Sequence, residues 1–576
     1  MIFAYNIYLK KIQTISWWIL IYFCIIFFRL VQLQIVQHEK FAESGKKNFL
    51  RFKIIPAQRG AILDSHGIAL ATNQPVTKVM WKGTGNIHLS AEQQNIIDRI
   101  NEILGYEAAV LARIKKTEKF SLETTIAENI TQEQLCCIAE QCSDTQNVTF
   151  TTSFHRFYPY GNIASHLLGY LGDVAICAQG QMGLEKICED TLRGDPGILV
   201  QSTNSFGSLL TSEEIKTGSC GADILTSIDL ELQQMVETAL QDQIEGCCIL
   251  LDPKTGFIKA LVSKPNFDPS IFSTKIEPEQ WQALQEQKVF LNRAFNASYP
   301  PASVFKLVTI AAALEEKIIS TNEHFFCCGY SVFKDRQYYC NKHTGHGRIS
   351  TEECLAQSCN IPLFEIAKKI HIDTLAQYAF EFGLGNKTNI PFSEKTGLIP
   401  TNKWKLMTKG ERWWTGETLS ASIGQSFLLV TPIQVACMIG SIFTGYLVKP
   451  RITLTDYFEK KPINIHTNTR HFLQLCMKSA SSSGSARRLR KVGNLTIYAK
   501  TGTAQTKTRR NTEGGPIFEY NTRTDKEHGW FVSYFYTDNT EPLVMVMLLE
   551  HVGRSTYTTA VAHKFFIQYN KWSQQQ

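Results

Sequence analysis

The chain has 576 residues, of which 44% are hydrophobic and 19% are charged, and its formal net charge is +7. This length is too great for a single hydrophobic core and predicts about three or four domains. The composition excludes a disordered protein, which would be poorer in hydrophobic residues, and the small, dispersed positive charge gives no support for a nucleic-acid-binding protein.

An uncharged apolar stretch at residues 12–28 predicts a helix that spans a membrane. The stretch is near the minimum length for a span, and the side chain of Arg29 can reach the far interface, so that residues 30–36 lengthen the helix. Lys10 and Lys11 precede the stretch and place the N-terminus in the cytoplasm. No small-residue cleavage pattern follows, which favours an uncleaved anchor over a signal peptide. A helix buried in a protein core is the alternative.

The chain contains 16 cysteines, which would normally suggest disulfide bonds in an exported protein. Some of them are adjacent in sequence, and neighbouring cysteines rarely bridge each other without strain. These adjacent pairs are Cys136 with Cys137, Cys247 with Cys248, and Cys327 with Cys328. We therefore expect several cysteines to be small buried hydrophobic residues.

Turn signals and hydrophobic periodicity outline the elements that follow the anchor. Residues 54–75 predict a hairpin, and residues 86–150 mix helical patterns with short strands. The polar stretch 203–221 is typical of a linker. Residues 221–242 predict a strand followed by a helix, since the apolar period changes from two to about 3.6. Residues 246–263 predict two apolar strands joined by a tight turn.

A Lys-Thr-Gly triplet occurs four times, at Lys216, Lys254, Lys395 and Lys500. Lys254 lies in the predicted hairpin turn, where Pro, Lys and Gly serve turn geometry. Lys216 and Lys395 lie among turn and linker residues. Only Lys500 follows a β-rich run, and the small residues from Gly502 onward would let a substrate backbone approach closely. Lys500 is therefore the candidate functional lysine.

A Ser-x-x-Lys spacing joins Ser303 and Lys306. Two prolines precede Ser303 and residues 304–315 have helical periodicity, so we expect Ser303 in the first turn of a helix with Lys306 over the same face. Burial in an apolar helix lowers the pKa of an amine, which can then accept the hydroxyl proton and make the serine a nucleophile. Ser44 and Lys47 have the same spacing in a polar segment, where the lysine would stay charged.

A Ser-x-Asn element at Ser358 and Asn360 lies 55 residues after Ser303. The same spacing also begins at Ser202 and Ser320, so the spacing alone is weak evidence. Ser358 is distinguished by its context, a polar break between two apolar helical stretches. Side chains at such a break can face a cleft.

The order of the three motifs resembles that of the serine penicillin-binding proteins. The segments "NRAFNASYPPASVFK", "AQSCN", "YAKTGTAQ" and "HGWFVSYF" resemble the transpeptidase domain, and "PAQRGAILDSHGIALATN" and "RFYPYGNIASHLLGYLG" resemble the N-terminal module of class B members. "SIGQSFLLVTPIQVA" and "CNKHTGHGRIS" are most similar to penicillin-binding protein 2, the elongation enzyme. One departure is Ala302, where many relatives have glycine; we expect alanine to be tolerated in a helical turn.

This resemblance implies an α/β (α+β) fold. It implies an elongated mixed N-terminal pedestal and a C-terminal domain like the serine β-lactamases and transpeptidases, with an antiparallel sheet flanked by helices plus an all-helical lobe. We expect a cytoplasmic tail at residues 1–11, a single-pass anchor in the bacterial inner membrane at 12–36, and a non-catalytic or dimerisation-like module at 37–215. The transpeptidase domain would be residues 216–576, on the periplasmic side.

The resemblance also implies a mechanism. Ser303 attacks the penultimate D-Ala carbonyl of a peptidoglycan stem peptide, expels the terminal D-Ala, and forms an acyl-enzyme that an amine of a neighbouring stem releases. Lys306 is the base, kept neutral by burial and by the nearby cation Lys500. Ser358 and Asn360 relay protons and orient the substrate amide. β-Lactams, which mimic D-Ala-D-Ala, should acylate Ser303.

The third motif would bind substrate. Lys500 and Thr501 hold the terminal carboxylate of the stem, Gly502 allows close approach, and Thr503 adds a hydrogen bond. The backbone N–H groups of Ser303 and Thr503 form the oxyanion hole, where one donor is worth about 3 kcal/mol.

A structural zinc ion is a further expectation. Three cysteines and one histidine suit tetrahedral zinc, and some penicillin-binding protein 2 relatives carry a zinc site in this region. The candidate ligands are Cys327, Cys340, His346 and Cys359, with Cys328 and His343 as alternatives. A disulfide, or reduced core cysteines with His346 on the surface, would explain the same residues.

Several related functions compete with elongation. A β-lactam sensor, a catalytically silent scaffold of the wall-synthesis complex and a division-type class B transpeptidase share these features. A secreted β-lactamase is usually half this length and needs a water-activating glutamate that the sequence does not reveal, and D,D-carboxypeptidases typically lack the N-terminal module. By resemblance, the partners are stem peptides, β-lactams, a membrane glycosyltransferase of the shape, elongation, division and sporulation class, and other elongation-complex proteins.

Overall fold

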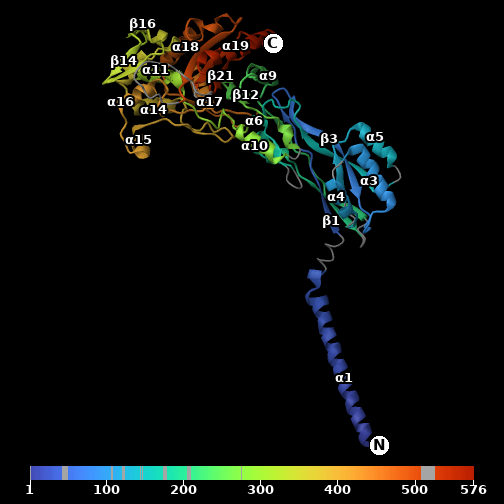
Figure 1. Cartoon of the computed structure of the whole chain (residues 1–576). Coiled ribbons are helices and arrows are strands. Elements are labelled where there is room, and N and C mark those ends of the chain that lie inside the picture. Colours follow the sequence, from blue (N-terminus) through green and yellow to red (C-terminus); the bar gives the residue numbers. More distant parts are fainter. Residues whose placement is uncertain are drawn as a thin grey trace. The chain divides into compact units, whose positions relative to one another are not determined.

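The chain folds into two compact units, seen in the computed structural model of Figure 1. The structure describes residues 2–41, 50–105, 108–119, 123–142, 145, 147–172, 178–203, 209–273, 276–506 and 526–575. The first unit consists of Met1–Gln58, Asn73–His155 and Gly194–Gly221. The second consists of Arg59–Thr72, Arg156–Arg193 and Ala222–Gln576.

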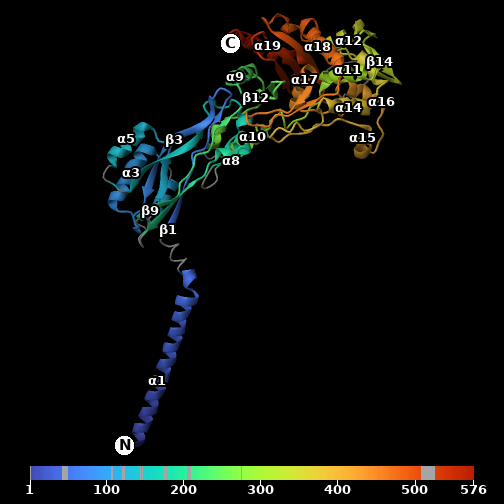
Figure 2. The same cartoon turned by 180° about the vertical axis from the view of Figure 1, so that it is seen from behind.

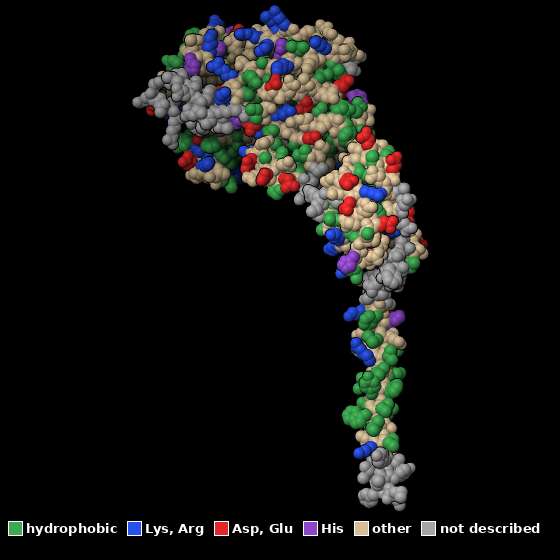
Figure 3. All heavy atoms as spheres, turned by 45° about the vertical axis from the view of Figure 1, so that its right-hand side comes forward, with side chains coloured by type: hydrophobic (Ala, Val, Ile, Leu, Met, Phe, Trp, Pro, Cys, Tyr) green, Lys and Arg blue, Asp and Glu red, His purple; other side chains and the backbone are tan. Residues whose placement is uncertain are grey.

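From Ile12 to Leu30, the N-terminal helix α1 (Ile2–Val31) presents exposed apolar side chains on all sides. Trp17, Trp18 and Tyr22 are each at least 65% exposed. Figure 3 shows hydrophobic side chains covering this helix, with basic side chains toward its two ends. The stretch Lys11–Val36 is long and apolar enough to cross a membrane, as the sequence predicts.

One sheet of the first unit overturns the prediction of a linker at residues 203–221. Its strand order is β1 (Leu50–Ile55), β8 (Gly197–Thr203) and β9 (Leu209–Lys216), paired antiparallel. From Leu210 onward, the residues of β9 are exposed. A strand without a buried face needs no alternation of apolar residues, so its polar sequence looked like a linker. Residues 204–208 lie outside the described part.

The rest of the first unit is a small α+β core. Trp81 on β3 is fully buried and packs with Ile97, Ile114 and Ile126 from the surrounding helices and strand. Its elements are β3 (Ala69–Lys82), α3 (Ala91–Leu104), α4 (Ala108–Lys119), β4 (Glu123–Glu128), α5 (Gln132–Gln141) and β5 (Val148–Phe157). This mixture of helices and short strands is as predicted. The predicted hairpin belongs to the second unit, where β2 (Ile62–Leu63) pairs with the first residues of β3.

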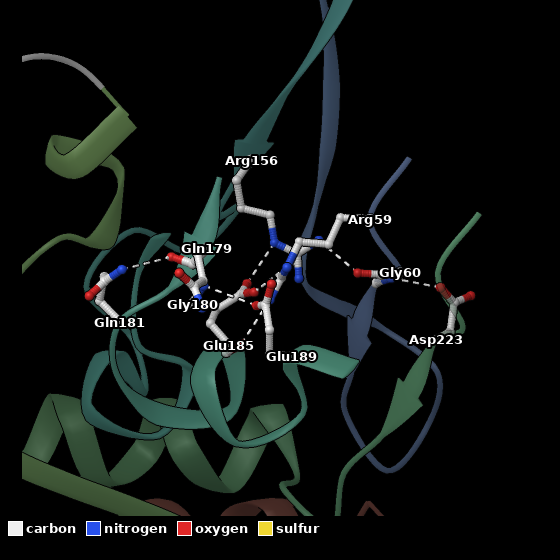
Figure 4. A network of polar contacts seen from close by, with 10 residues as sticks. Arg59, Gly60, Arg156, Gln179, Gly180, Gln181, Glu185, Glu189 and Asp223 are labelled. Atoms are coloured by element: carbon white, nitrogen blue, oxygen red, sulfur yellow. Dashed lines mark hydrogen bonds and ion pairs between the residues drawn. The ribbon is translucent and has the colours of Figure 1, made fainter. Parts of the chain in front are cut away.

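A buried cluster of charges holds the N-terminal segments of the second unit together (Figure 4). The carboxylate of Glu185, fully buried, accepts from Arg59 Nε at 2.7 Å and from Arg156 Nε at 2.6 Å. Arg59 also donates to Glu189 at 2.7 Å, and Arg156 to the Gly60 carbonyl at 2.8 Å. Since these residues come from segments far apart in sequence, the cluster fixes how the chain passes between them.

The second unit is built on a five-stranded antiparallel sheet. The strand order is β12 (Ile258–Lys264), β11 (Gly246–Leu251), β21 (Leu543–Leu549), β20 (His528–Tyr536) and β19 (Thr496–Ala504). Cys248 packs with α9 (Leu230–Ala239) and α19 (Ser555–Ser573), whereas its neighbour Cys247 faces the other core, which contains α17 (Pro432–Thr444). The adjacent cysteines are thus buried hydrophobic residues on opposite faces, as predicted.

A further group of helices lies toward one end of this unit, away from β12 (Figures 1 and 2), and α18 among them contacts β19. They are α11 (Lys306–Glu315), α12 (Thr351–Ala356), α13 (Ile361–Ala367), α14 (Ile372–Glu381), α15 (Asn402–Lys409), α16 (Thr415–Ser422) and α18 (Thr467–Ser482). The predicted fold class is confirmed. Two pairs of short strands, β13 (His324–Cys327) with β16 (Gly347–Ser350) and β14 (Tyr330–Phe333) with β15 (Arg336–Tyr339), interrupt the lobe that was predicted to be all helical.

Replacing Glu185 with alanine should destabilise the chain by about 3–5 kcal/mol, because two buried guanidinium groups lose their shared carboxylate. The free energy of unfolding of the detergent-solubilised chain measures this loss. The exposed pair of Lys254 and Glu541 provides the control, and Glu541→Ala should leave stability nearly unchanged. Equal effects of the two substitutions would contradict the assignment.

Candidate active site

Ser303 lies in a tight turn immediately before a helix. A 3-10 turn covers Ala302–Val304, and the α-helix α11 begins at Lys306. The sequence predicts Ser303 in the first turn of an α-helix, whereas the structure places it in the 3-10 turn that precedes the α-helix. The side chain of Ser303 is half-buried, whereas Lys306 is fully buried. Trp530 Nε1 donates to the Pro300 carbonyl at 2.9 Å and fixes the start of the turn.

Ala302 explains why the α-helix starts late. Its φ is +49°, in the left-handed region that an L-residue other than glycine rarely adopts, so the expected ordinary helical turn is wrong at this position. The Ala302 N–H donates to the carbonyl of Gly424 at 2.8 Å. A Cβ on Gly424 would lie 2.0 Å from the Ala302 oxygen. Only glycine at this position therefore lets the loop after α16 pack against the turn.

The amine of Lys306 is held by the Ser-x-Asn motif. Its Nζ donates to the Ser358 carbonyl and to Asn360 Oδ1, both at 2.7 Å, and lies 3.3 Å from Ser358 Oγ. Burial lowers the pKa of Lys306 to about 8, as predicted in direction. Among the described residues, no hydrogen bond joins this amine to the Ser303 hydroxyl.

Ser358 connects the two lysines. It lies between α12 and α13, as predicted, with a strained φ of +58°. Its Oγ also accepts from Lys500 Nζ at 3.1 Å. Burial, and then the charge of Lys306, hold the pKa of Lys500 well below its usual value. Burial is the largest cause of the lowered pKa of both amines, and the repulsion between them contributes to the lowered pKa of Lys500.

Strand β19 brings the third motif against the Ser303 turn. A Cβ added to Gly502 would lie 3.3 Å from the Trp530 Cβ and 3.4 Å from the Ser303 nitrogen, so the strand lies directly against the turn at this position. Thr501 Oγ1 donates to Ser485 Oγ at 2.8 Å.

Thr503 is fixed by two residues that sequence reasoning missed. Its Oγ1 lies 3.1 Å from Ser555 Oγ, and its carbonyl accepts from Gln425 at 3.3 Å. Gln425 lies in the quoted segment "SIGQSF", which could have marked it. Ser485 and Ser555 are ordinary helix-flanking serines that carry no sequence signal.

The other Lys-Thr-Gly triplets do not contribute to the site. Lys254 lies in the tight turn between β11 and β12, as predicted, and Lys395 is exposed in a loop. Lys216 is the exposed last residue of β9, which corrects its predicted place in a linker. The second Ser-x-x-Lys spacing, at Ser44 and Lys47, lies outside the described residues.

The four expected metal ligands converge beside this motif. His346 Nδ1 lies 3.5 Å from both Cys327 Sγ and Cys340 Sγ, and Cys340 Sγ lies 3.6 Å from Cys359 Sγ. All four donor atoms lie within 4.8 Å of one another. Zinc bonds of about 2.3 Å to sulfur and 2.0 Å to nitrogen in a tetrahedron place ligand atoms roughly 3.5–3.8 Å apart. The cluster can therefore hold a metal ion.

The alternative ligands and a disulfide do not fit the cluster. The side chains of Cys328 and His343 are exposed, and Cys328 Sγ bonds to the Tyr330 carbonyl. The distance between Cys340 and Cys359 is too long for a disulfide of about 2.05 Å. A Cβ on Gly345 would lie 2.3 Å from the Cys327 carbonyl, so a glycine lets the loop carrying His346 approach.

Two family models match the chain. Residues 246–569 match the penicillin binding protein transpeptidase domain, and residues 54–226 match the penicillin-binding protein dimerisation domain. The chain belongs to the penicillin-binding protein transpeptidase family. The transpeptidase match includes all three motifs, so the second unit contains a transpeptidase domain of this family.

Relatives resemble this penicillin-binding protein along most of their length. It is 29% identical to peptidoglycan D,D-transpeptidase MrdA of Acinetobacter baumannii, over 90% of this chain and 81% of that protein. It is 27% identical to the Haemophilus influenzae protein of that name, over 98% and 92%.

Two solved structures share the fold. A chain from the structure "Structural coordination of polymerization and crosslinking by a peptidoglycan synthase complex" is 27% identical, with a TM-score of 0.73 over 98% of both chains. PBP2 of Helicobacter pylori in complex with MreC has a TM-score of 0.75 at 23% identity, over 91% of this chain and 99% of that one.

Proposed function

We propose that this penicillin-binding protein is a peptidoglycan D,D-transpeptidase of the elongation type, which cross-links stem peptides through an acyl-enzyme on Ser303. The observation that carries the proposal is the buried amine of Lys306, three residues after Ser303. This amine donates hydrogen bonds to the Ser358 carbonyl and to Asn360 Oδ1. An amine whose pKa is lowered by burial can accept a proton near neutral pH. The sequence similarity to the MrdA transpeptidases supports the same reaction.

Acylation begins when Ser303 Oγ attacks the carbonyl carbon of the penultimate D-Ala. The Oγ proton passes to the Lys306 amine, and the backbone N–H groups of Ser303 and Thr503 stabilise the oxyanion. The C–N bond to the terminal D-Ala then breaks, and this leaving amine receives a proton from Lys306 through Ser358. The product is an ester between Ser303 and the stem peptide.

Deacylation repeats these steps with a second stem peptide. Its side-chain amine attacks the ester carbonyl and gives a proton to the site, and the ester bond breaks as Ser303 Oγ recovers a proton. One peptide bond is broken and one is formed, so the overall reaction needs no oxidant, reductant or nucleotide.

Substrate recognition falls to the third motif. Lys500, Thr501 and Thr503 would hold the carboxylate of the terminal D-Ala, while Gly502 lets the substrate backbone lie against β19. Binding a carboxylate would also favour the charged form of Lys500, opposing the burial that lowers its pKa. A β-lactam carries an equivalent carboxylate and would acylate Ser303 in the same way.

The proposed domain boundaries follow from this assignment. Residues 1–11 form a cytoplasmic tail, 12–36 a single inner-membrane anchor, 37–215 the pedestal and 216–576 the periplasmic transpeptidase domain. The lysines before the apolar helix support this orientation.

We propose that the chain works with a membrane glycosyltransferase that polymerises the glycan, and with other elongation-complex proteins. Solved relatives support such partners, since one was studied in a peptidoglycan synthase complex and another with MreC.

Labelling with a fluorescent penicillin tests the proposed nucleophile. Mass spectrometry of the digested chain should find the adduct on the peptide that contains Ser303, and Ser303→Ala should abolish labelling because no hydroxyl remains to be acylated. Ser44→Ala, which alters the other Ser-x-x-Lys spacing, should label normally. An adduct on a different peptide would overturn the assignment.

The cluster of Cys327, Cys340, His346 and Cys359 is proposed to hold one structural zinc ion. Three thiolates and one imidazole form a closed tetrahedral donor set, which is typical of structural zinc. Because Cys359 stands between Ser358 and Asn360, the ion would fix the backbone that presents both residues to Lys306.

Metal content tests this proposal independently of activity. Chain purified without added zinc should contain about one zinc ion per molecule, and His346→Ala should lose most of it because one of four ligands is missing. Cys328→Ser removes an exposed neighbouring thiol and should keep the zinc. A wild-type chain without zinc would contradict the proposal.

A further inference from the structure

A cleft of about 550 Å³ opens in the transpeptidase domain between the β14–β15 hairpin and the start of α16. These elements lie side by side in both Figure 1 and Figure 2. Its walls combine aromatic rings with two basic side chains and one acidic side chain, Asp335, which lies between the two basic residues in sequence. The residues that carry this chemistry are Phe333, Lys334, Arg336, Tyr338, Trp413 and Trp414.

The aromatic walls are partly fixed and partly open. Trp413 Nε1 donates to Thr418 Oγ1 at 2.8 Å, and Tyr338 Oη donates to the Gly416 carbonyl at 3.4 Å, so both rings are held in place. Trp414 is 60% exposed. A large apolar ring held open beside a cleft costs solvation free energy unless a ligand covers it.

The basic side chains lie at the tip of the hairpin. The Arg336 guanidinium lies 5.7 Å from the ring centre of Tyr338. Lys334 occupies the turn with a strained φ of +53°. Among the described residues, no carboxylate forms an ion pair with either cation, whereas the nearby Glu417 is already paired with Lys405 at 2.7 Å. The two cations outnumber Asp335, the one carboxylate that lines the cleft, so the cleft offers a net positive charge to an anionic ligand.

This cleft is physically connected to the catalytic motif. The carbonyl of Tyr339, next to Tyr338 on β15, accepts from Asn360 Nδ2 at 3.0 Å. The ring of Tyr338 packs edge-on against Phe364, with ring centres 5.6 Å apart. Phe364 is four residues beyond Asn360 on α13, about 6 Å along the helix axis. The hairpin that lines the cleft thus contacts both Asn360 and the helix that follows it.

We propose that this cleft is a subsite for the glycan strand that carries the stem peptides. The C–H faces of N-acetylated pyranoses stack on exposed aromatic rings, and the free carboxylates of the attached peptides pair with Lys334 and Arg336. The volume suits a small or narrow ligand, whereas a protein partner would need about 800 Å² of surface on each side. This inference rests on the proposed function, because it assumes a peptidoglycan substrate.

Binding to the full-length, detergent-solubilised chain tests the subsite. The probes are an uncross-linked glycan oligomer with pentapeptide stems and the free pentapeptide, each added to Ser303→Ala protein so that no reaction follows. Trp414→Ala and Arg336→Ala should each weaken oligomer binding about tenfold. Trp414→Ala should leave pentapeptide binding unchanged, and both variants should leave penicillin acylation unchanged in chain that retains Ser303.

Two further variants separate ring chemistry from general damage. Trp414→Phe should retain most of the oligomer affinity, and Tyr457→Ala, which removes an aromatic ring that is 76% exposed elsewhere in the domain, should have no effect. Unchanged oligomer binding in Trp414→Ala and Arg336→Ala would overturn the subsite and leave the cleft to another ligand, as would equal losses for oligomer and pentapeptide in Trp414→Ala. Failure of penicillin to acylate the wild-type chain would instead overturn the proposed function.

Discussion

The burial of one amine organises the active site. Lys306 has no access to solvent, so its Nζ must find hydrogen-bond acceptors within the protein, and these are the Ser358 carbonyl and Asn360 Oδ1. To present both acceptors, the chain must break between α12 and α13 and place Ser358 in a left-handed conformation. The same burial lowers the pKa of the amine, which a proton acceptor requires.

The proposed metal site and the catalytic motif share a single loop. Cys359 contributes its Sγ to the cysteine and histidine cluster, while its carbonyl accepts from Lys306 at 3.2 Å. Asn360 likewise makes two hydrogen bonds. Its backbone N–H donates to Cys340 Sγ, and its side-chain Nδ2 donates to the Tyr339 carbonyl. Disturbing the cluster would therefore move the acceptors of the buried amine. The hairpin that lines the proposed glycan subsite joins the same network through Tyr339.

Sequence reasoning found the parts of this site that have strong local signals. The hydroxyl, the amines and the Ser-x-Asn break were identified because they lie within apolar runs, and the structure brings them together. It missed features that depend on distant contacts. The left-handed Ala302 is imposed by the Gly424 loop, more than a hundred residues away, and the strand β9 has no buried face to produce a pattern. The β14–β15 hairpin was also missed, because its short, mostly exposed strands give too few residues for a period to show.

The rate at which penicillin acylates the Lys306→Met variant tests the central claim most directly, since methionine matches the lysine side chain as far as Cε but lacks the amine. If the buried amine takes the Ser303 proton, the acylation rate constant should fall by about 10³-fold while the chain remains folded. An acylation rate close to that of the unmodified chain, in a variant with the same unfolding temperature, would contradict the account.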